Sequence, residues 1–336
     1  MTKVSVIIPA HNVEKYISQT IESILNQTIN DLEVLCVYDG SKDDTLEILK
    51  EFAQKDKRIK IIYTELTKPG IARNFGLEQA NGEFVLFLDG DDFLEENALE
   101  ILVDKISKDN SDMVIFDVYH YFEKTKTKNP YNFGSCYYSV FKGKPFSPSE
   151  IYEKIFDNIS GYPFKFYRRD FLIENDIRYS NHKFVEDSLP LFKSLICAKK
   201  ISTIDFPLLN YRIHQENSSL SVSKYFDDIF SVFFECEQEI LKHKDSIALL
   251  PSFLNNRVNQ VLFWYKKIEK SQKQLYYKKM RALFKYILKN YSQFLNSNFP
   301  YTKFDFVVKN NYFFYQIFYK ISLLKYLFSS YFVWFL

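Results

Sequence analysis

Glycine and cysteine are scarce in this sequence of 336 residues, which contains 8 and 4 of them. The four cysteines, Cys36, Cys136, Cys197 and Cys236, stand far apart without a CxxC pair. This spacing disfavours a zinc site or a disulfide framework and fits a reducing compartment. The sequence has neither a GxGxxG fingerprint nor a GxxxxGK loop followed by Ser or Thr. A dinucleotide-binding fold and a P-loop nucleotide site are therefore excluded.

A secretory leader and a long apolar run are also lacking. Residues 1–3 lead directly into a strand-like segment, and no charged region, apolar stretch and cleavage site precede it. The longest uncharged run near the C-terminus, residues 326–336, is shorter than the roughly 20 residues that cross a bilayer. We expect a cytoplasmic protein without a membrane-spanning helix.

The net charge of +2 conceals an uneven distribution. Residues 241–336 contain 16 Lys and Arg against 3 Asp and Glu, whereas residues 1–240 contain 28 against 39. The length suffices for one sizeable core and a smaller unit. We therefore predict a first domain over residues 1–220 and a helical, basic and aromatic-rich region over residues 221–336.

Apolar runs and helix-period segments alternate along the first domain. Strands are predicted over residues 4–9, 32–38, 59–63 and 84–88, with helices over 13–27, 43–54 and 71–80, the first of them capped by Asn12. This order predicts an α/β fold with a mostly parallel sheet and a ligand site at the carboxyl ends of its strands.

Carboxylates follow two of these predicted strands. Asp39 stands at the end of the second, where it can accept hydrogen bonds from a base or ribose, although Asp-Gly is also a common turn pair. Asp89, Asp91 and Asp92 crowd the end of the fourth, where a hard divalent cation, Mg²⁺ or Mn²⁺, would relieve their repulsion. An acidic helix start is the alternative, but it leaves Asp89 unexplained.

A Pro-Gly turn at residues 69–70 starts the third helix and places Arg73 in its first turn. A cation is mildly unfavourable at that end of a helix, so an anion nearby, such as a diphosphate, would account for it. Solvation on a helix surface is the alternative interpretation.

Four segments, VSVIIPAHN, YDGSKD, GIARNFGLEQANGE and FLDGDD, resemble in order and spacing glycosyltransferase family 2, whose fold is GT-A. The resemblance covers about residues 3–220 and departs at Tyr38, where the family commonly has Asp. It implies that Asp39 meets the nucleobase, generally uracil, that Asp89 lies near the ribose, and that Asp91 binds the metal with Asp89. Arg73 would lie beside the nucleotide, and the donor site would include Pro9, Asn12 and Gly90.

The same resemblance extends to Glu186 and Asp187, which are similar to a Glu-Asp pair whose Asp is the general base. Glu186 would orient the site; without the resemblance, both residues fit an acidic first helical turn. Lys165 is similar to a lysine on the acceptor side. Arg212 and His214 lie on a segment that, in related enzymes, can close over the diphosphate, where His214 would contact phosphate or metal. The alternation of Tyr211 and Ile213 with polar neighbours fits an edge strand equally well.

The basic region contains an amphipathic helix over residues 276–291, with Lys278, Arg281, Lys285 and Lys289 opposite its apolar side. It either packs on the first domain or docks on anionic lipid. Residues 299–336 hold 16 aromatics, which favours a membrane surface. Nucleic acid is not expected as a partner, because no recognisable binding module is present.

Together these features predict an inverting, metal-dependent hexosyltransferase on the inner face of the cytoplasmic membrane. We expect the transfer of a hexose or N-acetylhexosamine from a UDP-sugar to a bacterial surface glycan such as lipooligosaccharide, O-antigen or capsule. The favoured donors are UDP-galactose and UDP-glucose. One alternative is a nucleotide-sugar-binding scaffold without turnover, which a measurement of donor hydrolysis would distinguish from the enzyme. The other is a nucleotidyltransferase, which would need a Gly-rich loop after the first strand.

Overall fold

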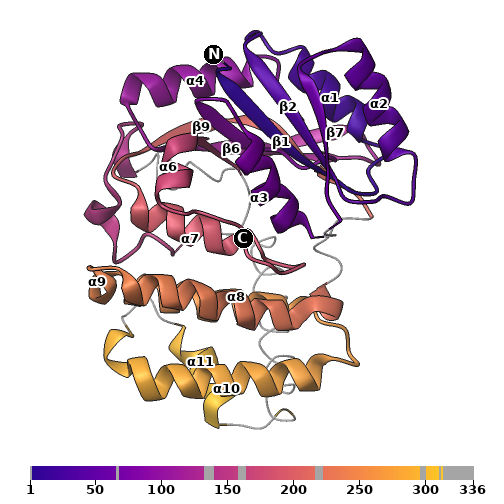
Figure 1. The fold of residues 1–336 in the computed structure, drawn as a ribbon. Helices are drawn as coiled ribbons and strands as arrows, with labels where there is room; N and C mark the ends of the chain where they lie inside the picture. Colours follow the sequence, from indigo (N-terminus) through magenta and orange to yellow (C-terminus); the bar gives the residue numbers. More distant parts are fainter. Residues whose placement is uncertain are drawn as a thin grey trace, which may run out of the picture.

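A computed structural model describes residues 2–65, 68–131, 140–157, 164–215, 222–295, 300–309 and 312. An α/β layer carries a nine-stranded sheet in the order β3-β2-β1-β4-β8-β6-β9-β5, with β7 paired to β6 (Figure 1). The strands are β1 (Val4–Ala10), β2 (Leu32–Tyr38), β3 (Ile59–Tyr63), β4 (Phe84–Phe87), β5 (Phe93–Leu94), β6 (Met113–Phe122), β7 (Thr127–Tyr131), β8 (Lys165–Arg168) and β9 (Ile201–Ile213).

The first four strands are parallel, as their near-continuous apolar sequences predict. Val4 of β1 pairs with Leu32 of β2 on one side and with Phe84 of β4 on the other. Every residue of β4 is buried. Antiparallel β8 lies between β4 and β6, so the sheet is mixed but mostly parallel. The carboxyl ends of β1, β2 and β4 consequently meet at one edge of the sheet.

Helices flank this sheet, and the first three lie close to their predicted positions. They are α1 (Ile17–Leu25), α2 (Thr45–Lys55), α3 (Pro69–Gln79), α4 (Ala98–Asp109), α6 (Arg169–Glu174) and α7 (Ser188–Cys197), with a 3₁₀ turn η1 (Pro148–Ile151). Helix α3 packs on β1 and β2, and α4 packs on β6 and β9.

Two local predictions were wrong. Asn12 is not the cap of the first helix, because α1 begins at Ile17 and Asn12 has a left-handed φ of 52° that belongs to a loop. Arg73 lies beyond the first turn of α3, since the helix begins at Pro69, where the missing N–H of proline is tolerated.

Four helices form two further layers below the sheet in Figure 1. They are α8 (Val222–Lys242), α9 (Ser246–Lys267), α10 (Lys273–Tyr291) and α11 (Tyr301–Lys309), with a 3₁₀ turn η3 (Ser292–Phe294) after α10. Helix α7 packs on α8, α8 on α9, α9 on α10, and α10 on α11. The predicted boundary at residue 220 falls outside the described residues, and the first helix after it begins at Val222.

Helix α10 has the predicted amphipathic pattern, and it packs on α9 and α11. Its apolar side, which includes Tyr276, Met280 and Phe284, is buried inside the molecule. Lys278, Lys285 and Lys289 lie on the exposed side, whereas the guanidinium of Arg281 donates to the Val308 carbonyl. Among the described residues, none of the helices combines the length and apolarity that a membrane crossing requires. Most of the aromatic segment 299–336 lies outside the described residues.

Candidate active site

A cavity of about 1130 Å³ opens at the strand ends. Pro9 of β1, Asp39 after β2 and Asp89 after β4 all line it, as the parallel arrangement predicts. Further lining residues from the predicted site are Asn12, Arg73, Gly90, Asp91, Glu186, Asp187 and His214. Predicted site residues that lie up to about 200 positions apart in the sequence therefore line the same cavity.

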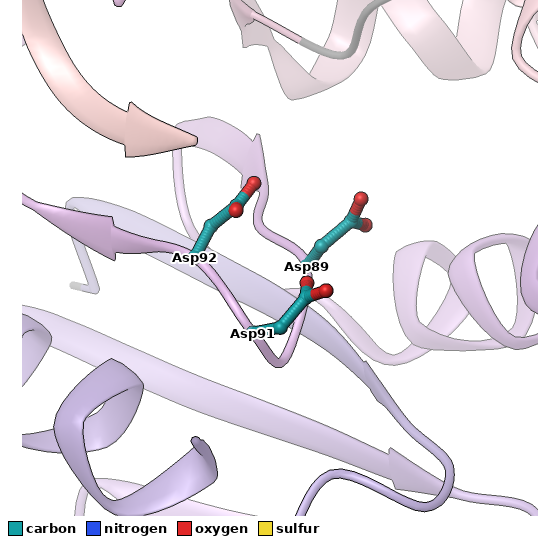
Figure 2. A group of neighbouring side chains, drawn as sticks. All are labelled: Asp89, Asp91 and Asp92. Carbon is teal, nitrogen blue, oxygen red and sulfur yellow. The ribbon is translucent and has the colours of Figure 1, made fainter. Parts of the chain in front are cut away.

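The turn after β4 places three carboxylates together (Figure 2). One oxygen from each of Asp89, Asp91 and Asp92 lies within 4.8 Å of the others. Asp92 is buried and accepts a hydrogen bond from the Arg212 backbone at 2.8 Å. Its burial, and to a smaller extent the charges of Asp91 and Asp89, raise the pKa of Asp92 well above the usual range. Asp89 and Asp91, by contrast, line the cavity. They are the two members of the cluster that a ligand can reach.

His214 lies just beyond the end of β9, beside this acidic group. Its Nε2 atom is 2.8 Å from Oδ2 of Asp91, and its ring lies 4.6 Å from that of Tyr16. Carboxylate oxygens suit Mg²⁺ and Mn²⁺, and an imidazole is compatible with Mn²⁺. The carboxylate oxygens of Asp89 and Asp91 therefore fit a divalent cation, and the imidazole of His214 lies beside Asp91.

Arg73 bridges two carboxylates of the site. Its guanidinium lies 2.5 Å from Oδ1 of Asp89 and 2.8 Å from Oε1 of Glu186. Burial alone would lower the pKa of Arg73, but the charges of Asp89, Tyr179 and Glu186 hold it well above the ordinary value. The alternative of a solvated surface arginine is wrong, because this side chain is only 5% exposed.

The segment that carries Glu186 and Asp187 is held close to α3. Val185 has a left-handed φ of 51°, and Asp187 is the N-cap residue of α7. Gly70 of α3 faces this segment so closely that a Cβ atom there would lie 2.6 Å from the Ser180 carbonyl oxygen and 3.0 Å from Cγ of Glu186. Only a residue without a side chain allows this approach.

The charges of Asp187 and of the buried Lys165 influence each other. Burial, and then the charge of Glu186, raises the pKa of Asp187 to about 7. Burial lowers the pKa of Lys165 to about 8, against the opposing effect of Asp187. Burial also raises the pKa of Glu186, although Arg73 opposes the shift. Asp187 is thus a carboxyl group that can gain and lose a proton near neutral pH.

Arg212 lies beneath the acidic turn and does not line the cavity. Its guanidinium donates to the Asp91 carbonyl oxygen at 2.6 Å and to Gln19 at 2.7 Å, and it pairs with Glu123. The side chain is 1% exposed. Arg212 therefore supports the turn from inside the protein.

Asp39 is tied to a residue that the sequence analysis did not single out. His11 Nδ1 lies 2.6 Å from Asp39 Oδ1, and both residues line the cavity. Burial raises the pKa of Asp39, although His11 opposes the shift. Asn12 joins the same two loops by accepting a hydrogen bond from the Lys42 backbone and donating one to Ser41. The only sequence signal for His11 was its place in the loop after β1.

The chain has the GT-A fold, and it superposes on solved glycosyltransferase structures. Staphylococcus aureus TarS residues 1–349, solved in complex with UDP-GlcNAc, superpose with a TM-score of 0.68 and 24% identity over 87% of this chain and 82% of that one. The mannosyltransferase PcManGT of Pyrobaculum calidifontis, solved with GDP-Man and Mn²⁺, has a TM-score of 0.51 and 15% identity over 78% of this chain and 75% of that one.

Sequence comparison identifies the family. The model of glycosyl transferase family 2 matches residues 5–175, and this chain belongs to that family. The putative glycosyltransferase EpsH of Bacillus subtilis (strain 168) is 32% identical over 217 residues, which are 63% of this chain and 61% of EpsH. The poly(ribitol-phosphate) beta-N-acetylglucosaminyltransferase TarS of S. aureus (strain MW2) is 32% identical over 76% of this chain and 44% of TarS. The match thus spans less than two thirds of either relative.

Proposed function

We propose that this chain is an inverting glycosyltransferase that moves a sugar from a UDP-sugar to a hydroxyl of a bacterial surface glycan. One observation carries the proposal: the Asp89–Asp91 pair and the Glu186–Asp187 pair line the same cavity and are joined by Arg73. The first pair has the chemistry to hold a metal and a diphosphate, and the second has the chemistry to accept a proton.

On the donor side, Asp39 receives the nucleobase and Asp89 the ribose, with Pro9, Asn12 and Gly90 forming the surrounding wall. Asp91 and Asp89, with His214, would hold Mn²⁺ or Mg²⁺. That ion, when bound, neutralises charge on the departing diphosphate. UDP-GlcNAc in the TarS structure supports an N-acetylhexosamine donor besides UDP-galactose and UDP-glucose.

On the acceptor side, Asp187 is the general base. A hydroxyl oxygen of the acceptor forms a bond to the anomeric carbon on the face opposite the nucleotide, and the bond from that carbon to the diphosphate oxygen breaks. The hydroxyl proton passes to the Asp187 carboxylate. Glu186 holds Arg73 beside the donor, and Lys165 stabilises the ionised form of Asp187.

The test of this function is protection from thermal unfolding by a panel of UDP-Glc, UDP-Gal, UDP-GlcNAc, UDP-GalNAc and GDP-Man, each with Mn²⁺ and with EDTA. A UDP-sugar at a hundred times its dissociation constant should stabilise the protein by about 2.7 kcal/mol and raise the melting temperature by a few degrees. GDP-Man is the control for recognition of the nucleobase, because it carries guanine in place of uracil. If none of the UDP-sugars protects, or none releases UDP on incubation, the proposal fails.

We also propose that the enzyme works at the inner face of the cytoplasmic membrane, attached through the exposed side of α10. Lys278, Lys285 and Lys289 lie there together with Leu275 and Leu288, which are 48% and 43% exposed. Lysines close to anionic lipid contribute about 1 kcal/mol each, and this attraction weakens with salt. A lipid-linked glycan would be presented at this surface.

The test of this attachment is sedimentation with phosphatidylserine vesicles. The double charge reversal Lys285→Glu with Lys289→Glu should weaken binding by about 10-fold or more. Lys50→Glu with Lys55→Glu on the exposed side of α2 changes the net charge equally and should have a smaller effect. Equal losses in both variants would show that net charge, and not α10, controls attachment.

A further inference from the structure

A stripe along α9 faces the same cavity as the family motifs. Its members Asn256, Asn259, Gln260, Phe263 and Trp264 all line the cavity. Their spacing of 3, 4, 7 and 8 residues from the first places them on one side of a helix. This stripe, which we name the α9 wall, lies beyond residues 5–175, where the family model matches. It belongs to the helical layer, not to the α/β layer (Figure 1).

The cavity has more room than one small ligand needs. Pockets for single ligands typically measure about 300–1,000 Å³, whereas this cavity measures about 1130 Å³. The residues assigned above to the donor and its metal come from α3 and from the ends of β1, β2, β4 and β9 or the loops that follow them. The α9 wall therefore borders space that is available to a second substrate.

The chemistry of the α9 wall suits a sugar ring. Amide side chains can donate to and accept from hydroxyl groups, and the bond from Asn259 to Asn255 at 3.1 Å uses one donor of the Asn259 amide. Phe263 is 45% exposed, and the Lys267 ammonium lies 4.8 Å from its ring centre and 5.2 Å from that of Trp264. Aromatic rings present a flat apolar face on which the C–H side of a sugar can pack.

The α9 wall is also connected to the proposed base. The Trp264 ring contacts that of Phe184 edge to face at 4.8 Å, and Phe184 precedes Asp187 by three residues. The Asp228 carboxylate of α8 accepts hydrogen bonds from the backbone N–H groups of Lys183 and Phe184 at 3.0 and 3.1 Å. The helical layer thus holds the segment that carries the base and lines the space beside it.

We infer that the α9 wall binds the acceptor as a carbohydrate, with a sugar ring packed on Phe263 and its hydroxyls bonded to the amides of Asn259 and Gln260. This inference rests on the proposed function and adds to it the place in the cavity that holds the acceptor sugar. The ring is held against α9 while one of its hydroxyls is presented to Asp187.

The experiment uses the fluorescence of Trp264 in a Trp334→Phe background, because the sequence has only these two tryptophans. Methyl glycosides of glucose, galactose, N-acetylglucosamine and mannose are titrated in the presence of Mn²⁺ and UDP. At least one should change the emission in a saturable way. Phe263→Ala should weaken that binding by about 10-fold. Asn259→Ala, at an exposed position that folding tolerates, should also weaken it.

Phe206→Ala is the matched control, because Phe206 is equally exposed at 47% and does not line the cavity. The inference is overturned if no glycoside binds, if glycerol 3-phosphate binds in their place, or if Phe263→Ala and Asn259→Ala bind glycosides as well as the control does. Failure of the proposed function would look different, since the unaltered protein would then bind no UDP-sugar.

Discussion

Asp91→Asn is expected to lower the rate of sugar transfer by about 1,000-fold or more while the protein stays folded. The substitution removes a negative charge from the cluster that faces the cavity and changes the partner of His214. A metal ion on a transferring group is worth several kcal/mol, and each 1.36 kcal/mol changes the rate tenfold. The measurement is UDP release with titrated Mn²⁺, and EDTA should reproduce the loss in the unaltered enzyme.

The control for Asp91 is Asp104→Asn, which makes the same chemical change at an exposed position of α4. It should retain full activity. A fully active Asp91→Asn enzyme, or an unaltered enzyme that is indifferent to EDTA, would show that the acidic turn holds no catalytic metal. Asp92→Asn is not a suitable control, because Asp92 is buried and accepts a hydrogen bond from the β9 backbone.

Asp187→Asn is expected to lower turnover by about 100- to 10,000-fold, the usual cost of removing a general base. Asparagine has nearly the same shape as aspartate but cannot take a proton from the acceptor hydroxyl. Affinity for the UDP-sugar should stay within about twofold, because Asp187 does not act on the donor in this mechanism. Steady-state kinetics and donor titration measure the two effects separately.

The pH profile provides the second readout for Asp187. The base works only when ionised, and its pKa of about 7 lies far above the ordinary aspartate value because the side chain is buried and close to Glu186. Activity of the unaltered enzyme should therefore rise about tenfold per pH unit up to about pH 7 and level off above it. Asp187→Asn should lack this rise. An unchanged profile, or a loss confined to donor affinity, would move the role to Glu186.

The strand segments and the grouping of the loops after them were predictable from the sequence. Residues 32–38 and 59–63 form strands with the predicted bounds, because apolar runs bounded by turn residues depend mainly on local sequence. Parallel pairing then brings together the loops at the carboxyl ends of the strands. The presence of Asp39 and Asp89 in one cavity could therefore be predicted from local sequence alone.

Features that depend on tertiary packing were not predictable. Arg73 and Arg212 are buried because carboxylates and carbonyls from distant segments surround their guanidinium groups, and a local pattern carries no trace of those partners. The α9 wall has a helical period, but a period alone does not say whether a side contacts protein or a ligand. Asn12 resembled a helix cap, although its left-handed backbone keeps it in a loop.

The close approach at Gly70 has a consequence for sequence variation among related chains. A side chain at this position would displace the Ser180 carbonyl or the Glu186 side chain, and with them one end of the Arg73 bridge. Helix propensity alone would favour alanine at position 70. The contact with residues 180–186, more than 100 positions away in the sequence, instead limits this position to glycine. A side chain at position 70 therefore requires the backbone at Ser180 to move, whatever residue stands at position 186.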